Sequence, residues 1–264
     1  MSADTDMWSP KEQYLKEMVS DTNKSEILQA ELHTPTTPYN LLQEIELTDL
    51  NINSNTDTRK KIKARSLWEN APCLVLVVRR PGCWLCRQEA IKLATYRELI
   101  TNKLGIDMIA VVHETVRNQV SDFNMDYWMG SIYLDESKGF YRALGNGELK
   151  WESPFAMLKP TVLMNYRRQK KETDCDGNMV GEGRILGGLL IMKPGDQGVA
   201  FDYHEKTFGD HAPLEHVLQA CYQVSLKKNT NPDLKQQVEK EVEKLKNEGF
   251  KRVEVCSVDG LCEL

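Results

Sequence analysis

The sequence predicts an α/β fold in which a central mixed sheet is flanked by helices. Residues 73–78 (CLVLVV) and 106–112 (IDMIAVV) are dense apolar runs with β-branched side chains, as expected of strands buried on both faces. The stretch between them, residues 86–104, places its apolar side chains near helical spacing. Strand, helix and strand at these lengths form a βαβ unit, in which the two strands run parallel.

The following elements extend this sheet. Residues 114–125 have a weak helical pattern, and residues 130–134 (GSIYL) have the composition of a third strand. Residues 135–144 are predicted to form a helix that ends at Gly145. Residues 146–183 contain several prolines and glycines, which predicts loops around one further helix.

Two more strands and a helix complete the unit. Residues 185–192 and 199–203 are joined by the segment 193–196 (KPGD), a connection short enough for an antiparallel hairpin. Residues 213–224 are predicted to form the closing helix. The apolar face of this helix consists of Leu214, Val217, Leu218 and Cys221. The order is therefore βαβ followed by ββα with an insertion between them, which is the order of the thioredoxin-like fold.

Composition divides the chain into three parts. Residues 1–58 are predicted to be an N-terminal extension of helix and loop, and residues 59–226 to form the thioredoxin-like domain. The basic run at 59–63 is expected to be a solvated helix start. Residues 227–264 are predicted to be a C-terminal helix and a cysteine-containing tail. This helix is mostly charged with a narrow apolar stripe, so we expect it to dock lightly on the domain rather than form a coiled coil with a partner.

Charge and hydropathy exclude several classes of function. The chain has 264 residues and a formal net charge of −5, which argues against nucleic acid as a partner. No apolar stretch approaches the roughly 18 to 20 residues of a membrane-spanning helix, so we expect no membrane partner. The first ten residues are polar and acidic, unlike a secretory signal, and we therefore expect a cytoplasmic protein. Seven cysteines without such a signal do not indicate a secreted disulfide scaffold.

The most informative motif is the pair Cys83 and Cys86, in C-x-x-C spacing at the predicted turn from strand to helix. Two thiols at this spacing can close a disulfide within one helical turn. The helix N-terminus carries partial positive charge, and Arg79, Arg80 and Arg87 surround the motif, so thiol pKa values should fall. The motif therefore predicts a redox-active dithiol, in which one thiolate attacks and the second thiol resolves the intermediate.

Two other interpretations of the pair stay open, namely a zinc site and two inert buried thiols. A zinc site needs two more ligands, but Cys256 and Cys262 are separated by five residues rather than two. The group His204, Glu205 and His211 lacks the H-E-x-x-H spacing, so we expect surface histidines and predict no metal.

Several residues around the dithiol are further candidates. Glu89 lies three residues after Cys86 on the same helical face, where it either accepts a proton and orients the site or is a partly exposed helix carboxylate. Gly187 and Gly188 are expected to permit close approach of the backbone beside the dithiol. Cys256 and Cys262 are expected to be exposed bystanders, with a resolving or relay role as the alternative. Cys73 and Cys221 are expected in the core, and Cys175 in a loop.

The run RRPGCWLCRQEA, residues 79–90, strongly resembles the signature of the peroxiredoxin-like 2 proteins, redox-regulatory members of the thioredoxin-fold AhpC/TSA superfamily. Further matches follow in chain order at residues 64–68 (ARSLW), 110–112 (AVV), 133–136 (YLDE), 181–183 (GEG), 186–188 (LGG) and 204–210 (HEKTFGD). The similarity covers roughly residues 40–226. It favours the A subfamily, whose members act as antioxidant thiol proteins.

The resemblance implies a thiol-disulfide oxidoreductase with antioxidant or redox-regulatory activity carried by the C-x-x-C dithiol. It implies a peroxide, a lipid endoperoxide or a protein disulfide as substrate. Electrons would come from an external thioredoxin- or glutathione-type, NADPH-linked system, with no bound cofactor. A sister subfamily reduces prostaglandin and prostamide endoperoxides to F-type products, and this activity is the first alternative. The second alternative is a non-enzymatic interaction protein on a thioredoxin scaffold.

The chain departs from peroxiredoxins proper, which carry Thr three residues before the attacking Cys and Glu three residues after it. Cys86 and Glu89 fit this frame, whereas Cys83 replaces the threonine. The analogy with peroxiredoxins favours Cys86 as the attacking thiol, and the analogy with thioredoxins favours Cys83. The later-strand arginine of peroxiredoxins is not found, and Gly187-Gly188 takes the place of the cis-proline of thioredoxins.

Overall fold

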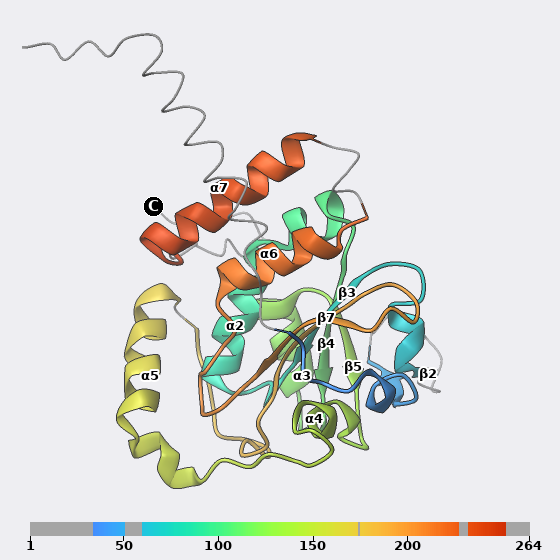
Figure 1. Ribbon diagram of the computed structural model, residues 1–264. Coiled ribbons are helices and arrows are strands. Elements are labelled where there is room, and N and C mark those ends of the chain that lie inside the picture. Colours follow the sequence, from blue (N-terminus) through green and yellow to red (C-terminus); the bar gives the residue numbers. More distant parts are fainter. Residues whose placement is uncertain (1–33, 51–59, 174, 227–231, 252–264) are drawn as a thin grey trace, which may run out of the picture.

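A computed structural model describes residues 34–50, 60–173, 175–226 and 232–251 of the chain. Seven strands form one mixed sheet: β1 (Glu46–Asp49), β2 (Lys61–Lys63), β3 (Cys73–Val77), β4 (Asp107–Val112), β5 (Ser131–Leu134), β6 (Gly188–Met192) and β7 (Val199–His204). Their order across the sheet is β2-β1-β5-β4-β3-β6-β7 (Figure 1). The predicted α/β class, with a central mixed sheet between helices in a thioredoxin-like arrangement, is confirmed.

The pairing of the strands follows the predicted units. β3 pairs with β4 in parallel, and β4 pairs with β5 in parallel, as the βαβ unit requires. β6 and β7 form the predicted antiparallel hairpin, and β6 lies antiparallel to β3. β6 begins at Gly188 rather than at residue 185, because Ile185 instead makes an isolated bridge to Trp151 in the inserted segment.

The helices are α2 (Trp84–Thr95), α3 (Gln119–Phe123), α4 (Gly139–Leu144), α5 (Pro160–Glu172), α6 (Leu214–Val224) and α7 (Pro232–Glu248). Short 3₁₀ turns occupy Tyr39–Leu41, Ala64–Leu67 and Pro154–Leu158, and wider π-type turns occupy Glu98–Lys103 and Asn124–Trp128. The helix predicted at 86–104 begins two residues earlier, and its last part is a π-type turn. None of the helices in the described ranges has the length and apolar composition needed to cross a membrane.

The central strands are buried on both faces, which explains their continuous apolar sequence. In β3, Leu74 and Leu76 face one core while Val75 and Val77 face the other, because successive side chains of a strand point to opposite sides. Side chains of α2, α6 and α7 pack in the first core, and those of α4 pack in the second. The sheet therefore lies between two packed layers, and α2 belongs to the first of them.

Two strands at the sheet edge were missed by sequence reasoning. β1 lies within residues 1–58 and pairs with β5, so part of the predicted extension belongs to the sheet. The expected helix start at 59–63 is wrong for residues 61–63, which form β2: Ile62 pairs with the buried Leu47 of β1. A single apolar residue between two lysines is too short a pattern to distinguish strand from helix. Residues 1–33 lie outside the described residues, and the division into three parts stays a prediction.

The last helix packs more firmly than expected. The apolar stripe of α7, formed by Leu234, Val238, Val242 and Leu245, is buried in the first core. α7 lies against the outer side of α6 (Figure 1). Because the stripe is covered within the chain, the described structure leaves no seam on α7 for a coiled-coil partner. Cys256 and Cys262 lie outside the described residues.

Candidate redox site

The dithiol lies where the sequence places it, between the end of β3 and the start of α2. Cys83 is the N-cap of α2: its backbone is extended, and its carbonyl accepts a hydrogen bond from the Arg87 N–H at 3.0 Å. Cys86 follows in the first helical turn. Both are free thiols, with exposed fractions of 6 and 5%. The helix N-terminus thus points its positive end at the pair.

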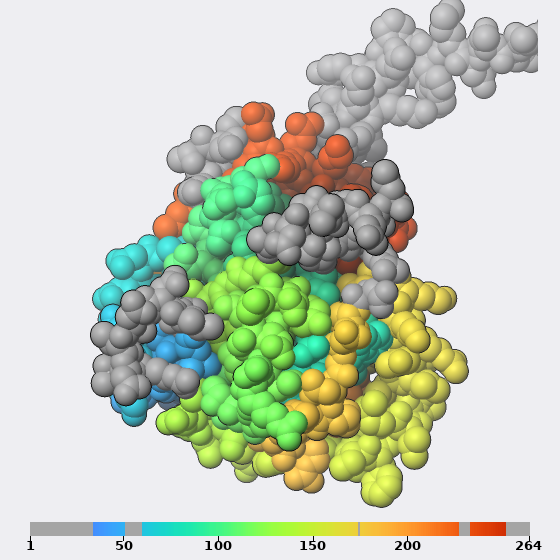
Figure 2. Space-filling model, turned by 180° about the vertical axis from the view of Figure 1, so that it is seen from behind, coloured from blue at the N-terminus to red at the C-terminus, as the bar shows by residue number. Residues whose placement is uncertain are grey.

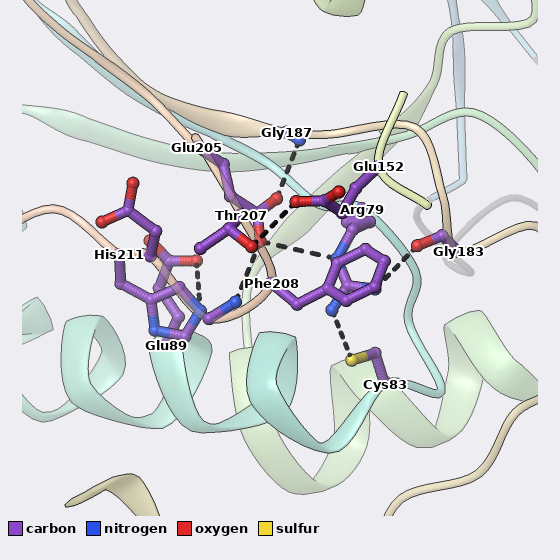
Figure 3. Close-up of polar contacts among 12 residues, drawn as sticks. Arg79, Cys83, Glu89, Glu152, Gly183, Gly187, Glu205, Thr207, Phe208 and His211 are labelled. Carbon is purple, nitrogen blue, oxygen red and sulfur yellow. Dashed lines mark hydrogen bonds and ion pairs between the residues drawn. The ribbon is translucent and has the colours of Figure 1, made fainter. Parts of the chain in front are cut away.

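Arg79 is the residue that contacts the dithiol directly. Its guanidinium donates a hydrogen bond from Nη2 to the Cys83 sulfur at 2.9 Å and another from Nη1 to the Gly183 carbonyl at 2.7 Å (Figure 3). The guanidinium also stacks over the Phe208 ring, 4.5 Å from its centre. These contacts hold a buried cation in one orientation, aimed at the thiol of Cys83.

The other two predicted arginines differ in their contacts. Arg80 lines the cleft beside Cys83 and packs against Gly183, and its Nη2 lies 3.2 Å from the Met179 sulfur. Arg87 turns away from the sulfurs: it donates to the carbonyls of Pro81 and Asp176 and stacks on Tyr127. Arg80 therefore adds positive potential at the thiol, whereas Arg87 ties the inserted segment to the start of α2.

The environment shifts the pKa values of the two thiols in opposite directions. A hydrogen bond from Cys86, together with the charges of Arg79 and Arg80, holds the pKa of Cys83 well below its ordinary value despite burial. The same hydrogen bond, together with burial, raises the pKa of Cys86 well above its ordinary value. The pKa values of the two thiols are therefore shifted in opposite directions. The arrangement therefore favours a Cys83 thiolate supported by a Cys86 thiol.

Glu205 anchors the other side of Arg79 and was missed as a site residue. Its carboxylate lies 3.5 Å from Arg79 Nε, and both side chains are buried. It also accepts hydrogen bonds from the backbone N–H groups of Gly187 and Gly209, at 3.0 and 3.2 Å. Burial raises the pKa of Glu205 although Arg79 opposes this shift. The family resemblance at residues 204–210 includes Glu205, but the spacing of residues in the sequence did not connect Glu205 to Arg79.

Glu89 faces His211 rather than the cleft. His211 Nε2 lies 3.5 Å from the Glu89 carboxylate, and only 9% of the His211 side chain is exposed (Figure 3). Burial raises the pKa of Glu89, and burial lowers the pKa of His211, so both neutral forms are favoured. The expectation of a surface histidine is therefore wrong for His211, because α2 and the segment after β7 enclose it. His204 instead contacts the carboxylate of Asp202 at 2.9 Å.

A cleft of about 470 Å³ opens at the dithiol. Cys83 lines it and Cys86 does not. Most of its wall is apolar, and its cations are the buried Arg79 and Arg80 and the more exposed Arg184. Its lining includes Arg80, Trp84, Tyr166, Met179, Arg184 and Phe208. Several of these residues come from the inserted segment, which thus forms a wall of the site. A substrate in this cleft would reach the sulfur of Cys83 first.

Gly187 brings β6 close to the segment that leads to the dithiol. A Cβ at this position would lie 2.1 Å from the Val77 carbonyl oxygen and 3.3 Å from the Arg79 nitrogen. Gly188 pairs with Val77 in the sheet. The close backbone approach that we expected of this pair is therefore present, and Gly187 connects to Cys83 through Glu205 and Arg79.

Replacement of Gly187 by alanine is expected to destabilise the protein by about 3 kcal/mol, because the backbone of β3 cannot move away from the added methyl. Urea unfolding followed by circular dichroism measures this cost. The matched control is Gly195→Ala, where the nearest atom would lie 3.9 Å from the added carbon. Its left-handed backbone predicts a cost of about 1 kcal/mol. Equal costs for the two variants would contradict the close approach at Gly187.

The remaining described cysteines do not extend the site. Cys73 and Cys221 are fully buried in the core, as expected, and burial raises the pKa of each thiol. Cys175 lies in a loop, as expected, with its sulfur 3.7 Å from the Trp84 carbonyl. Among the residues that the structure describes, no three His, Cys, Asp or Glu side chains are grouped so that they could hold a metal ion.

Several curated proteins with similar sequences carry the name peroxiredoxin-like 2A. Peroxiredoxin-like 2A of Xenopus tropicalis is 39% identical over 176 residues, which cover 66% of this chain and 74% of that protein. Peroxiredoxin-like 2A of Bos taurus is 38% identical, covering 69% of this chain and 78% of that protein. Peroxiredoxin-like 2A of Homo sapiens is 36% identical, covering 66% and 73%. The chain belongs to the peroxiredoxin-like 2 family.

The chain is also similar to a broader protein family and to several solved structures. The profile of the AhpC/TSA antioxidant enzyme family matches residues 92–207, a segment that begins after the dithiol. Among solved structures, the bacterioferritin comigratory protein of Xanthomonas campestris is similar, with 12% identity and a TM-score of 0.45 over 73% of this chain and 97% of that chain. Peroxidoxin BcpB of Mycobacterium tuberculosis has the same identity and coverage, with a TM-score of 0.43. The assignment to the peroxiredoxin-like 2 family rests on the curated relatives.

Proposed function

We propose that this peroxiredoxin-like 2 protein is a dithiol oxidoreductase in which Cys83 attacks the substrate and Cys86 resolves the intermediate. The observation that carries the proposal is the position of Cys83. It is the thiol of the pair that lines the cleft and that accepts the hydrogen bond from Arg79. A low pKa, a helix N-terminus and access from a cleft are the properties of a nucleophilic cysteine. The proposal therefore follows the analogy with thioredoxins, in which Cys83 attacks, rather than the analogy with peroxiredoxins, in which Cys86 attacks.

With a disulfide substrate, the Cys83 thiolate attacks one sulfur of the substrate. A bond forms between Cys83 and that sulfur, the substrate S–S bond breaks, and the other substrate sulfur leaves and takes a proton. Cys86 then loses its proton and attacks the Cys83 sulfur. This step closes the Cys83–Cys86 disulfide and releases the second substrate thiol. The substrate gains two electrons and the dithiol loses two.

With a peroxide substrate, the thiolate attacks one oxygen and the O–O bond breaks. The other oxygen takes a proton and leaves as an alcohol, or as water when the substrate is hydrogen peroxide, while Cys83 becomes a sulfenic acid. Cys86 condenses with the sulfenic acid, which releases water and forms the same disulfide. An external thiol of the thioredoxin or glutathione type, supplied by NADPH, then reduces the disulfide. Because the cycle needs this reductant, we place the protein in a reducing compartment such as the cytoplasm. No bound cofactor takes part in the cycle.

The hydrogen bond between the thiols controls the order of the steps. While Cys83 is a thiolate, its charge and its hydrogen bond keep the proton on Cys86. Once Cys83 has reacted, its charge is gone, and two of the causes that raise the pKa of Cys86 disappear with it. Cys86 then ionises more easily and attacks. The resolving thiol is therefore activated by the first step.

The cycle is tested by oxidising the reduced protein with glutathione disulfide or hydrogen peroxide and mapping disulfides by mass spectrometry. We expect a reversible Cys83–Cys86 disulfide with a reduction potential of about −180 to −300 mV, the range of cytosolic thiol couples. Cys175→Ser is the matched control, because this loop cysteine is partly exposed, and we expect the same potential. A Cys256→Ser/Cys262→Ser variant with an unchanged potential would show that the tail thiols are bystanders. If Cys83 and Cys86 stay reduced, the oxidoreductase hypothesis is wrong, and the result favours a non-enzymatic interaction protein.

A lipid endoperoxide reductase is the second candidate, and the apolar wall of the cleft favours it. Trp84, Tyr166 and Phe208 form this wall, while the buried Arg80 and the more exposed Arg184 suit a substrate carboxylate. In such a reaction the thiolate attacks one oxygen, the O–O bond breaks, and the other oxygen takes a proton. Cys86 then attacks the Cys83 sulfur, which breaks the S–O bond, closes the disulfide and releases the second oxygen, protonated by the Cys86 proton, as part of a diol. NADPH-coupled turnover of a prostaglandin-type endoperoxide would support this candidate. Turnover of disulfides alone would remove it.

A further inference from the structure

The segment 151–173, which forms one wall of the cleft, has an unusual surface. Exposed apolar side chains gather on it and at Met179, beside the thiol site, and few other large apolar side chains of the described residues are exposed. The most exposed are Phe155 and Leu158, both at 80%. We name the apolar tip as Phe155, Leu158, Leu163 and Met164. These side chains lie on the 3₁₀ turn before α5 and on the first turns of α5.

α5 places cations directly after the apolar tip. The outer side of the helix, opposite the buried Val162 and Gln169, carries the basic face, which we define as Arg167, Arg168, Lys170 and Lys171. Residues 151–173 hold five Lys or Arg and two Glu, for a net charge of +3 in a chain whose net charge is −5. α5 lies at the margin of the molecule in both views (Figures 1 and 2). The tip and the basic face are therefore accessible together.

We propose that the apolar tip and basic face of α5 dock on the surface of an anionic lipid bilayer. Exposed aromatic and aliphatic side chains next to a cluster of Lys and Arg are the pattern of an element that lies in a membrane interface. The cations bind lipid phosphates and carboxylates, while the tip enters the boundary between headgroups and acyl chains. We expected no membrane partner because no segment spans a bilayer, but a surface-bound helix needs no span.

The shape of the surface favours a bilayer over a folded protein partner. Phe155 and Leu158 project outward and do not line the cleft. A rigid protein partner would need a separate pocket for each, whereas a bilayer interface accepts apolar side chains at any spacing. Met157 and Tyr166 lie in the same segment and line the cleft. Docking would therefore bring the opening of the cleft to the interface, where oxidised lipids lie.

Flotation of the full chain with phosphatidylcholine vesicles, with and without phosphatidylserine, tests the proposal. We expect binding only to the vesicles with phosphatidylserine, and weaker binding as salt is added. The variant Phe155→Ser/Leu158→Ser should lower the affinity more than about tenfold, because two exposed apolar side chains no longer enter the interface. The variant Arg167→Glu/Lys171→Glu should lower it by about 25-fold or more, at about fivefold per removed charge.

Matched controls separate the surface from general hydrophobicity and charge. Leu226→Ser removes an exposed apolar side chain outside the tip, and Lys60→Glu/Lys240→Glu reverses two exposed lysines outside the basic face. Both controls should bind like the unmodified chain. Equal binding to neutral vesicles, no binding to either, or equal losses in the controls would overturn the proposal. The proposal would also be overturned if the Phe155→Ser/Leu158→Ser variant bound the vesicles normally and lost only its binding to an acidic protein. The dithiol plays no part in this readout, so vesicle binding and the redox function can fail independently.

Discussion

Replacing Cys83 by serine is expected to lower the rate of substrate reduction at least about a thousandfold, to the level of the uncatalysed reaction. A serine hydroxyl does not ionise near neutral pH, so neither Arg79 nor the helix N-terminus can generate a nucleophile from it. Turnover in an assay coupled to NADPH through a thioredoxin- or glutathione-type reductant measures the loss. The small change in volume should leave the fold intact, and an unchanged urea unfolding midpoint would confirm that.

Cys86→Ser is the informative partner of this variant. It should lose turnover as well, but it should accumulate a covalent intermediate on Cys83, because the attacking thiol is present and the resolving thiol is not. Mass spectrometry after a pulse of glutathione disulfide would detect the mixed disulfide. If the intermediate instead accumulates on Cys86 in the Cys83→Ser variant, then Cys86 is the attacking thiol. That result would support the analogy with peroxiredoxins, in which Cys86 attacks and Glu89 lies three residues after it.

Replacing Arg79 by methionine is expected to raise the pKa of Cys83 by about one to two units. The lost contact is a hydrogen bond from a charged donor to the sulfur, worth about 1.5–3 kcal/mol, and one pKa unit corresponds to 1.36 kcal/mol. The rate of iodoacetamide alkylation of Cys83 rises with pH as the thiolate forms and then levels off. In the variant this profile should move to higher pH. The variant also removes a charge that lowers the pKa of Glu205, so we expect the pKa of Glu205 to rise further.

The same variant should also change the redox potential. Arg79 stabilises the thiolate, which exists only in the reduced form, so its loss should make the dithiol more reducing by about 30–60 mV. Arg184→Met is the matched control, because Arg184 also lines the cleft but pairs with Glu182 rather than with the sulfur. Its alkylation profile and potential should change little. Equal shifts in both variants would mean that the general potential of the cleft, rather than the contact from Arg79, sets the pKa.

The elements that sequence reasoning found are those with strong local patterns. β3 and β4 are continuous apolar runs, and α6 has a regular apolar face, so each identifies itself without its neighbours. β1 and β2 are short and half-polar, and they become strands only because β5 offers hydrogen-bond partners to β1, and β1 in turn offers them to β2. The pattern of a few residues carries too little information to predict such pairing.

The sequence by itself determined the dithiol, its place at the start of a helix and the family to which the chain belongs. These features depend on neighbours in the chain, since the spacing of Cys83 and Cys86 and the start of α2 are local. The tertiary structure decided which thiol faces the cleft, that Arg79 rather than Arg87 reaches the sulfur, and that Glu205 stands behind Arg79. Glu205 lies more than a hundred residues from the dithiol in the chain, and the inserted segment lies about 60 to 100 residues from it, so only folding brings them to the site. Local sequence thus supplies the reactive groups, while packing between distant segments sets their ionisation and their access to substrate.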